Sequence, residues 1–165
     1  MKPAGKSVLL FWLCAVVMVQ ASSAVQGPAP PPAGSEYLVD VWDTDRGLPS
    51  YSALSFAQTP DGYLWVGTYA GLARFDGVQF KVIDASNTPG FPGVTAFRLY
   101  VDRRGWLWVS TEGGMACLRQ GHWTAFSAAQ GWPSGFARRF VEDRDGNLLV
   151  SNGKRLFRFV NDHFL

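Results

Sequence analysis

The chain has few of the residues that bind metals or form disulfides. Its 165 residues include two cysteines and two histidines, which indicates neither a disulfide framework nor a Cys/His zinc site. Lysine and arginine number 15 against 13 aspartate and glutamate, and the two signs are interspersed. Because no basic stripe is present to neutralise phosphates, we do not expect nucleic acid as a partner.

The sequence also lacks an apolar run of membrane-spanning length, which needs about 20 residues. The run "SVLLFWLCAVVMV" is shorter, follows two lysines and precedes the small residues Ser22 and Ala24. This order is typical of a secretory signal peptide, so we expect 1–24 to be removed and the protein to reach the periplasmic or extracellular side of a bacterial envelope. An uncleaved membrane anchor is the alternative. After cleavage, Cys117 is the single cysteine, so no internal disulfide forms.

Catalytic motifs are absent as well. The sequence holds no phosphate-binding glycine loop, no G-x-S-x-G nucleophile and no recognisable Ser/His/Asp triad. Asp102, Glu142 and Asp143 stand directly before turns, where a carboxylate caps the turn backbone, and this favours a structural role over acid–base catalysis. His122 and His163 hold equivalent positions without acidic or thiol partners, so we interpret them as exposed turn residues. We predict no enzymatic activity, no cofactor and no metal.

Aromatic residues and glycine, in contrast, are abundant. Seven Trp, twelve Phe and eighteen Gly are typical of short strands that carry large side chains and are joined by tight turns. The stretch "DGYLWVGTYAGLARFDGVQF" begins at Asp61 and returns 43 residues later, at Arg104, as "RGWLWVSTEGGMACLRQGHW". A third copy, "DGNLLVSNGKRLFRFVNDHF", begins a further 41 residues on, at Asp145. The chain therefore contains three units of about 42 residues.

Within a unit the apolar residues alternate with a period of two, which predicts strands rather than helices. In the first unit, Pro60–Gly62 forms a tight turn, Leu64 and Val66 share one face of a strand, and Asp76–Gly77 is a strong hairpin signal. Four short antiparallel strands in roughly 40 to 45 residues are the period of a β-propeller blade. The large side chains, Trp65 among them, would then pack one sheet against the next.

The predicted fold is therefore all-β, with three four-stranded antiparallel β-propeller blades. A Pro-rich linker, 25–35, leads into a folded part, 36–165. The expected blades are approximately 48–90, 91–132 and 133–165. Propellers close with about four to eight blades, so three form an incomplete ring.

The repeated pattern D-G-x-L-W-V-G-T-x-x-G-L-x-R-F-D-G, with the lead-in "VWDTDRGLPS", resembles the two-component regulator propeller repeat. This repeat is found in the periplasmic sensor regions of bacterial hybrid histidine kinases and of some diguanylate cyclases. The resemblance covers about Asp40–Leu165. It weakens along the chain, because the second unit has Ser110 and Met115 where the first has Gly and Leu, and the third has Leu149 and Arg155 where the first has Trp and Gly.

The resemblance implies a non-enzymatic, extracytoplasmic ligand-sensing segment of a two-component receptor whose kinase or cyclase module lies elsewhere. The alternative is a secreted β-propeller enzyme or a lectin-like carbohydrate-binding module. We expect the chain to be the N-terminal piece of a longer sensor. Its partners would be a small ligand, a glycan fragment being one class that relatives bind, and further blades or other copies of the chain.

A ligand site is expected in the loops at one end of the ring, since loops on a rigid scaffold carry most binding residues. The short loops are "TYAG", "TEGG" and "NGKR", and the longer connections are "DASNTPGFPG" and "SAAQGWPSG". Their most ligand-like side chains are Tyr69, Glu112 and Trp132. Trp108 repeats the position of Trp65 and is expected to pack between sheets, and Cys117, in mid-strand, is expected to be a buried or half-buried thiol.

Overall fold

The computed structural model describes residues 39–133 and 135–165. The predicted signal peptide, 1–24, and the predicted linker, 25–35, lie outside these residues. The strands all belong to one compact unit, Asp40–Leu165. In the described part of the chain, no helix has the length and apolar character needed to cross a membrane.

The described residues form three four-stranded antiparallel sheets, each hydrogen-bonded in chain order. We call them blades 1, 2 and 3. Blade 1 contains β1 (Ala53–Gln58), β2 (Leu64–Thr68), β3 (Gly71–Phe75) and β4 (Phe80–Ile83). Blade 2 contains β5 (Ala96–Val101), β6 (Leu107–Thr111), β7 (Gly114–Arg119) and β8 (His122–Phe126). Blade 3 contains β9 (Arg139–Glu142), β10 (Leu148–Ser151), β11 (Leu156–Val160) and β12 (His163–Phe164).

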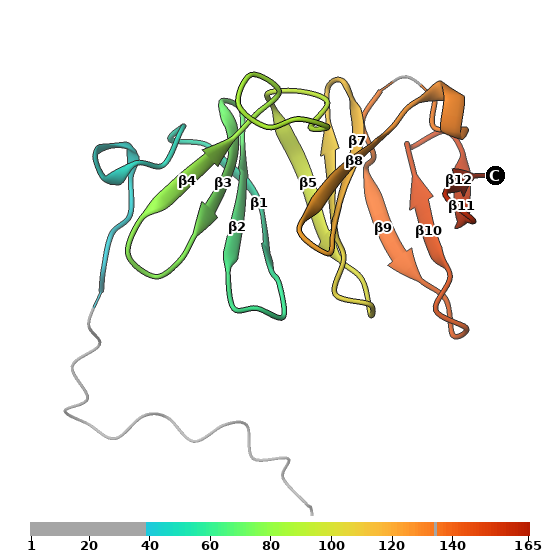
Figure 1. Ribbon diagram of the computed structural model, residues 1–165, viewed down its shortest axis with the longest axis horizontal. Helices are drawn as coiled ribbons and strands as arrows, with labels where there is room; N and C mark the ends of the chain where they lie inside the picture. Colours follow the sequence, from blue (N-terminus) through green and yellow to red (C-terminus); the bar gives the residue numbers. More distant parts are fainter. Residues whose placement is uncertain (1–38, 134) are drawn as a thin grey trace, which may run out of the picture. The chain divides into compact units, whose positions relative to one another are not determined.

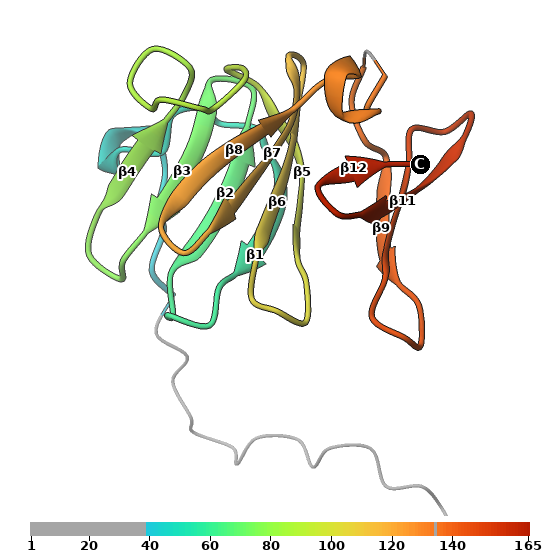
Figure 2. The same ribbon diagram turned by 45° about the vertical axis from the view of Figure 1, so that its right-hand side comes forward.

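The blades follow one another in chain order without closing a ring, as both ribbon views show (Figures 1 and 2). The first strands of blades 1 and 2, β1 and β5, lie side by side. Only two short 3₁₀ turns, η1 (Thr44–Arg46) and η2 (Ala128–Gln130), interrupt the all-β pattern of the described residues. The predicted fold class is confirmed.

Carboxylates fix the turns between the first and second strands of the later blades. The Oδ1 atom of Asp102 accepts hydrogen bonds from the N–H groups of Arg104 and Trp106, each at 3.0 Å. Asp143 does the same in blade 3, where its Oδ1 accepts from Asp145 and Asn147. The hydrogen bonds from Asn147 hold the pKa of Asp143 below its ordinary value. The prediction of a turn-capping role is confirmed for both aspartates.

The repeated tryptophans pack between neighbouring blades. Trp65 points at blade 2 and is 2% exposed, and Trp108 points at blade 3 and is fully buried. Each indole N–H is satisfied by the residue six positions earlier: Trp65 donates to the Thr59 hydroxyl at 2.9 Å, and Trp108 donates to Asp102 Oδ2 at 3.0 Å. A buried indole needs such a partner, so the turn that begins each unit also completes the blade interface.

Blades 1 and 2 approach each other closely beside their first strands. A Cβ atom on Gly67 would lie 2.5 Å from the carbonyl oxygen of Ala96, so only glycine fits there. Blade 2 has Ser110 at this repeat position, and the Ser110 hydroxyl accepts a 2.6 Å hydrogen bond from the N–H of Ala137. Ser110, which departs from the glycine of the repeat pattern, therefore makes the contact with the next blade through a hydrogen bond instead of through close backbone packing.

Replacement of Ser110 by alanine is expected to destabilise the fold. The change leaves the buried N–H of Ala137 without its acceptor, which costs about 1–3 kcal/mol. Urea unfolding of S110A should show this loss, whereas S52A, at an exposed position, should unfold like the parent chain. Equal unfolding midpoints for the two variants would refute the importance of this contact.

Candidate functional site

One end of the blades gathers the loops in which a ligand site is expected. These loops are the β2–β3, β6–β7 and β10–β11 turns and the longer β4–β5 and β8–β9 connections, which lie at the top of Figure 1. We call this surface the loop face. The three residues predicted to bind a ligand, Tyr69, Glu112 and Trp132, all lie on its turns and connections. The structure divides them between two cavities.

Tyr69 lines a cavity of about 440 Å³ near the first strands, which we call the arginine cavity. The tyrosine side chain is exposed. The cavity is built by all three blades: blade 1 supplies Leu54 and Tyr69, blade 2 supplies Phe97 and Arg98, and the β8–β9 connection together with blade 3 supplies the rest. These remaining residues are Phe136, Arg138, Arg139, Ser151 and Gly153.

The arginine cavity is strongly cationic. Within residues 39–133 and 135–165, none of Arg98, Arg138 and Arg139 takes part in an ion pair. Arg98 donates to the carbonyl oxygen of Leu54 at 3.2 Å, and Arg139 donates to that of Arg138 at 2.8 Å. Each guanidinium has five N–H donors, so most of them stay available to an anion in the cavity.

Aromatic rings lie beside these cations. Phe97 and Phe136 pack with their centroids 4.7 Å apart, and the Arg138 guanidinium lies 5.4 Å from the centre of the Phe136 ring. Phe136 is 39% exposed. The cavity thus combines positive charge with exposed ring surface, an arrangement that can bind an anionic molecule with an apolar or planar face.

Glu112 and Trp132 lie together, at a smaller cavity of about 220 Å³. Glu112 Oε1 accepts a 2.7 Å hydrogen bond from the N–H of Val94, which ties the β6–β7 turn to the β4–β5 connection. Trp132 is fully buried, packs on Phe157 and donates its indole N–H to the carbonyl oxygen of Gly135. In this structure both side chains have partners within the protein.

The buried position of Trp132 has a signal in the sequence. The segment "GFPG", which contains Phe91, aligns with "GWPS", which contains Trp132, 41 residues later. Phe91 is also buried, and its ring lies 5.0 Å from Trp123 in the preceding blade interface. In each of these two connections, the aromatic residue of a Gly-aromatic-Pro sequence therefore fills the space between successive blades.

The arginines of the cavity were missed by the sequence prediction. Arg98 and Arg139 hold the same position in successive units, 41 residues apart, on β5 and β9. Because equivalent residues on the first strands of neighbouring blades lie close together, this repeated position was the available signal. The first unit has Ser55 at that position.

Glu142 does not cap its own turn, which corrects the sequence prediction. Its Oε2 accepts hydrogen bonds from the N–H of Arg103 at 3.0 Å and from the hydroxyl of Tyr100 at 3.3 Å, both in blade 2. The side chain is long enough to reach the neighbouring blade, so it caps that blade's turn. Burial and the Glu142 charge raise the pKa of Tyr100.

The two histidines and Cys117 do not gather into a metal-binding group in the described residues. His122 and His163 are exposed at the beginnings of β8 and β12, and no group of three His, Cys, Asp or Glu gathers there. Cys117 is fully buried between blades 2 and 3. Burial and, to a smaller extent, the Asp102 charge raise the pKa of its thiol to about 12, so the thiol stays protonated and unreactive near neutral pH.

Three successive four-stranded blades define the described part of the chain as a segment of a β-propeller. Residues 47–70 and 90–113 match the model of the two component regulator propeller family. The third unit, which departs most in sequence, is not among the matched residues.

Two solved structures share the fold. The extracellular domain of hybrid two component system BT3049 from B. thetaiotaomicron superposes with a TM-score of 0.67 at 23% identity, covering 77% of this chain and 18% of that one. The extracellular domain of system BT4673 from the same organism gives a TM-score of 0.58 at 27% identity, covering 73% of this chain and 17% of that one. The chain thus spans less than a fifth of either. No curated protein sequence matches it.

Cys117 should resist thiol reagents in the folded protein. In a Cys14→Ser variant, where Cys117 is the sole thiol, labelling near neutral pH should require denaturant. The free energy of unfolding should also fall as the pH rises above about 9, because the unfolded thiol ionises near 9.0 while the folded thiol keeps its proton up to about 12. Rapid labelling without denaturant would contradict the buried position.

Proposed function

We propose that the chain is the ligand-sensing propeller segment of an extracytoplasmic two-component receptor, and that its ligand binds in the arginine cavity. The match to the two component regulator propeller model supports the sensor role. The convergence of Arg98, Arg138 and Arg139 on one cavity is the observation that supports the site. Tyr69 is the residue from the sequence prediction that this site retains.

The proposed ligand is a small anionic molecule, and an acidic glycan fragment fits the chemistry. A carboxylate or sulfate group would pair with the guanidinium groups, which bind such groups through two parallel hydrogen bonds. The ring of Tyr69 and the exposed part of Phe136 offer surfaces for the face of a sugar ring. Neutral sugars would lack the charge interaction.

The proposed signal is a shift in the arrangement of the blades or of the propeller as a whole. A ligand held by residues of three blades favours the arrangement in which those residues lie at the observed positions. The chain itself is proposed to be non-enzymatic. The kinase or cyclase step would be carried by another part of a longer receptor, in line with the small share of the related extracellular domains that this chain covers.

A further proposed contact is the outward face of blade 1, which is apolar. Trp42, Phe75 and Phe80 cluster there, with ring centroids 4.5–6.0 Å apart. The same face forms a hollow of about 180 Å³, in which Phe56 is 61% exposed. We propose that another blade, from the same receptor or from a second copy, covers this face.

Titration with an acidic oligosaccharide tests the arginine cavity. The unmodified chain should bind a uronate-containing oligosaccharide, more weakly as salt increases, and should not bind the neutral counterpart. Arg139→Gln removes one charged donor, worth about 1.5–3 kcal/mol, and should weaken binding at least about tenfold. Tyr69→Ala should also weaken it.

Arg144→Gln is the matched control for this titration, because it removes the same charge from an exposed position outside the cavity. Its affinity should equal that of the unmodified chain in isothermal titration calorimetry. Equal affinity for the acidic and neutral oligosaccharides, or an unchanged affinity in Arg139→Gln, would reject the proposed site.

A further inference from the structure

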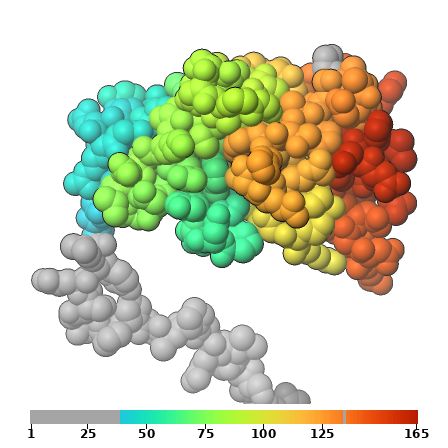
Figure 3. Space-filling view, viewed as in Figure 1, coloured from blue at the N-terminus to red at the C-terminus, as the bar shows by residue number. Residues whose placement is uncertain are grey.

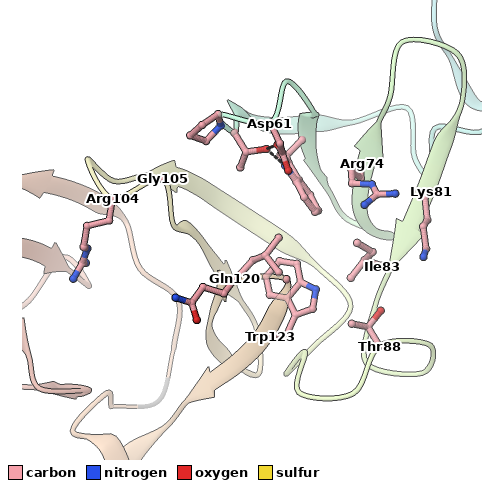
Figure 4. Close-up of a pocket in the computed structure, with 14 residues that line it drawn as sticks. Asp61, Arg74, Lys81, Ile83, Thr88, Arg104, Gly105, Gln120 and Trp123 are labelled. Atoms are coloured by element: carbon pink, nitrogen blue, oxygen red, sulfur yellow. Dashed lines mark hydrogen bonds between the residues drawn. The ribbon is translucent and has the colours of Figure 1, made fainter.

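A second and larger cavity, of about 530 Å³, lies between blades 1 and 2, away from the arginine cavity. We call it the interblade cleft. Blade 1 contributes Trp65, Arg74 and Lys81, and blade 2 contributes Leu118 and Trp123. Figure 4 shows Arg74 and Lys81 together on one wall, with Gln120 and Trp123 across from them. In the space-filling view, the β1–β2 and β7–β8 turns, both of which line the cleft, are neighbours on the surface (Figure 3).

The sheet register places the two cations side by side. Trp65 is paired with Arg74 across β2 and β3, and Arg74 is paired with Lys81 across β3 and β4. Residues directly opposite each other in an antiparallel sheet point to the same face. All three side chains therefore point toward blade 2, as Trp65 does in the core between these blades.

At the interface between blades 2 and 3, the residues equivalent to Trp65, Arg74 and Lys81 only pack against the neighbouring blade. Blade 2 has Trp108, Cys117 and Thr124 in the equivalent row. Cys117 is fully buried there, and aromatic side chains such as Phe159 and Phe164 pack against Trp108 and fill the space. The interface of blades 1 and 2 instead has two long cations and an open cavity at the same place.

Neither cation has an acidic partner. Within the described residues, Arg74 and Lys81 form no ion pair. The Arg74 guanidinium lies 4.2 Å from the centre of the Tyr63 ring, and its Nε atom is buried without a hydrogen-bond partner. A buried donor without an acceptor is costly, so the Arg74 side chain is incompletely satisfied by the protein.

The other charged groups around the cleft do not supply the missing anion. Arg104 is already paired with Asp102 at 2.6 Å and lies over the ring of Trp106. Asp61, at the rim, accepts a hydrogen bond from the Thr59 hydroxyl and forms no ion pair with the cations of the cleft. The wall formed by blade 1 therefore carries two positive charges that form no ion pair with a carboxylate of the described residues.

We propose that the interblade cleft binds a small organic anion. Its carboxylate, sulfate or phosphate group would be held by Arg74 and Lys81, and its apolar body would lie against Trp123 on the opposite wall. This site is independent of the arginine cavity and of the proposed sensor function. Because the ligand would contact both blades, its binding would stabilise their interface, and the free energy of unfolding would rise with the logarithm of the ligand concentration above Kd.

Titration with simple anions tests the cleft. The probes are inorganic sulfate, inorganic phosphate, phenylacetate and, as the neutral counterpart, phenylacetamide, each at constant ionic strength in isothermal titration calorimetry. Calorimetry is chosen because sulfate also raises Tm by exclusion from the protein surface. Phenylacetate should bind more tightly than sulfate or phosphate, and phenylacetamide should not bind.

Three variants locate the binding site. Arg74→Gln and Lys81→Gln should each weaken phenylacetate binding at least about tenfold. Lys81 is exposed, so its variant keeps the test valid if Arg74→Gln fails to fold. Arg144→Gln should bind like the unmodified chain, and Arg139→Gln, altered only in the arginine cavity, should do the same.

Three results would overturn this proposal. One is the absence of anion binding by the unmodified chain up to about 10 mM. Another is equal binding in Lys81→Gln and Arg144→Gln, which would mean that the anion is attracted by the general charge of the protein. Loss of binding in Arg139→Gln alone would assign the anion to the arginine cavity and would likewise reject the cleft.

Discussion

The structure depends on the burial of sheet faces between neighbouring blades. Trp65 points from blade 1 into blade 2, and Trp108 points from blade 2 into blade 3, so each large indole is buried by the following blade. Blade 2 has a neighbour on each side, and every residue of β6 is buried. Blades 1 and 3 have one neighbour each within the described residues. A single blade could not fold alone for this reason, and the cavities between blades exist only when the blades are assembled.

The sequence predicted the parts of the structure that repeat. The period of two predicted the strands, Asp102 and Asp143 predicted the turns, and the shared position of Trp65 and Trp108 predicted the packing between sheets. The direction of Arg98 could not be predicted in this way. The register of β5 shifts between Ala96 and Arg98, and such a bulge turns the following side chains to a face that simple alternation does not give.

The two cavities show how one scaffold can carry different chemistry at equivalent positions. The row that contains Arg74 in blade 1 contains Cys117 in blade 2, and the backbone pairing is the same in both. The position of Arg98 and Arg139 is occupied by Ser55 in blade 1. The hydrogen-bonded ladder constrains the backbone and leaves the side chains at these positions free to differ, so charge can be introduced without a change of fold.

The contact beside the first strands has a consequence for how such a protein can change by gene duplication. Gly67 fits against the carbonyl oxygen of Ala96, whereas Ser110 needs the N–H of Ala137. Glu142 is a second residue that depends on a particular neighbour, because it caps a turn of blade 2 and not its own turn. A blade copied or moved by recombination would meet a neighbour that lacks its complementary group. A new blade would therefore need substitutions at these contact positions before the order of the repeats could change.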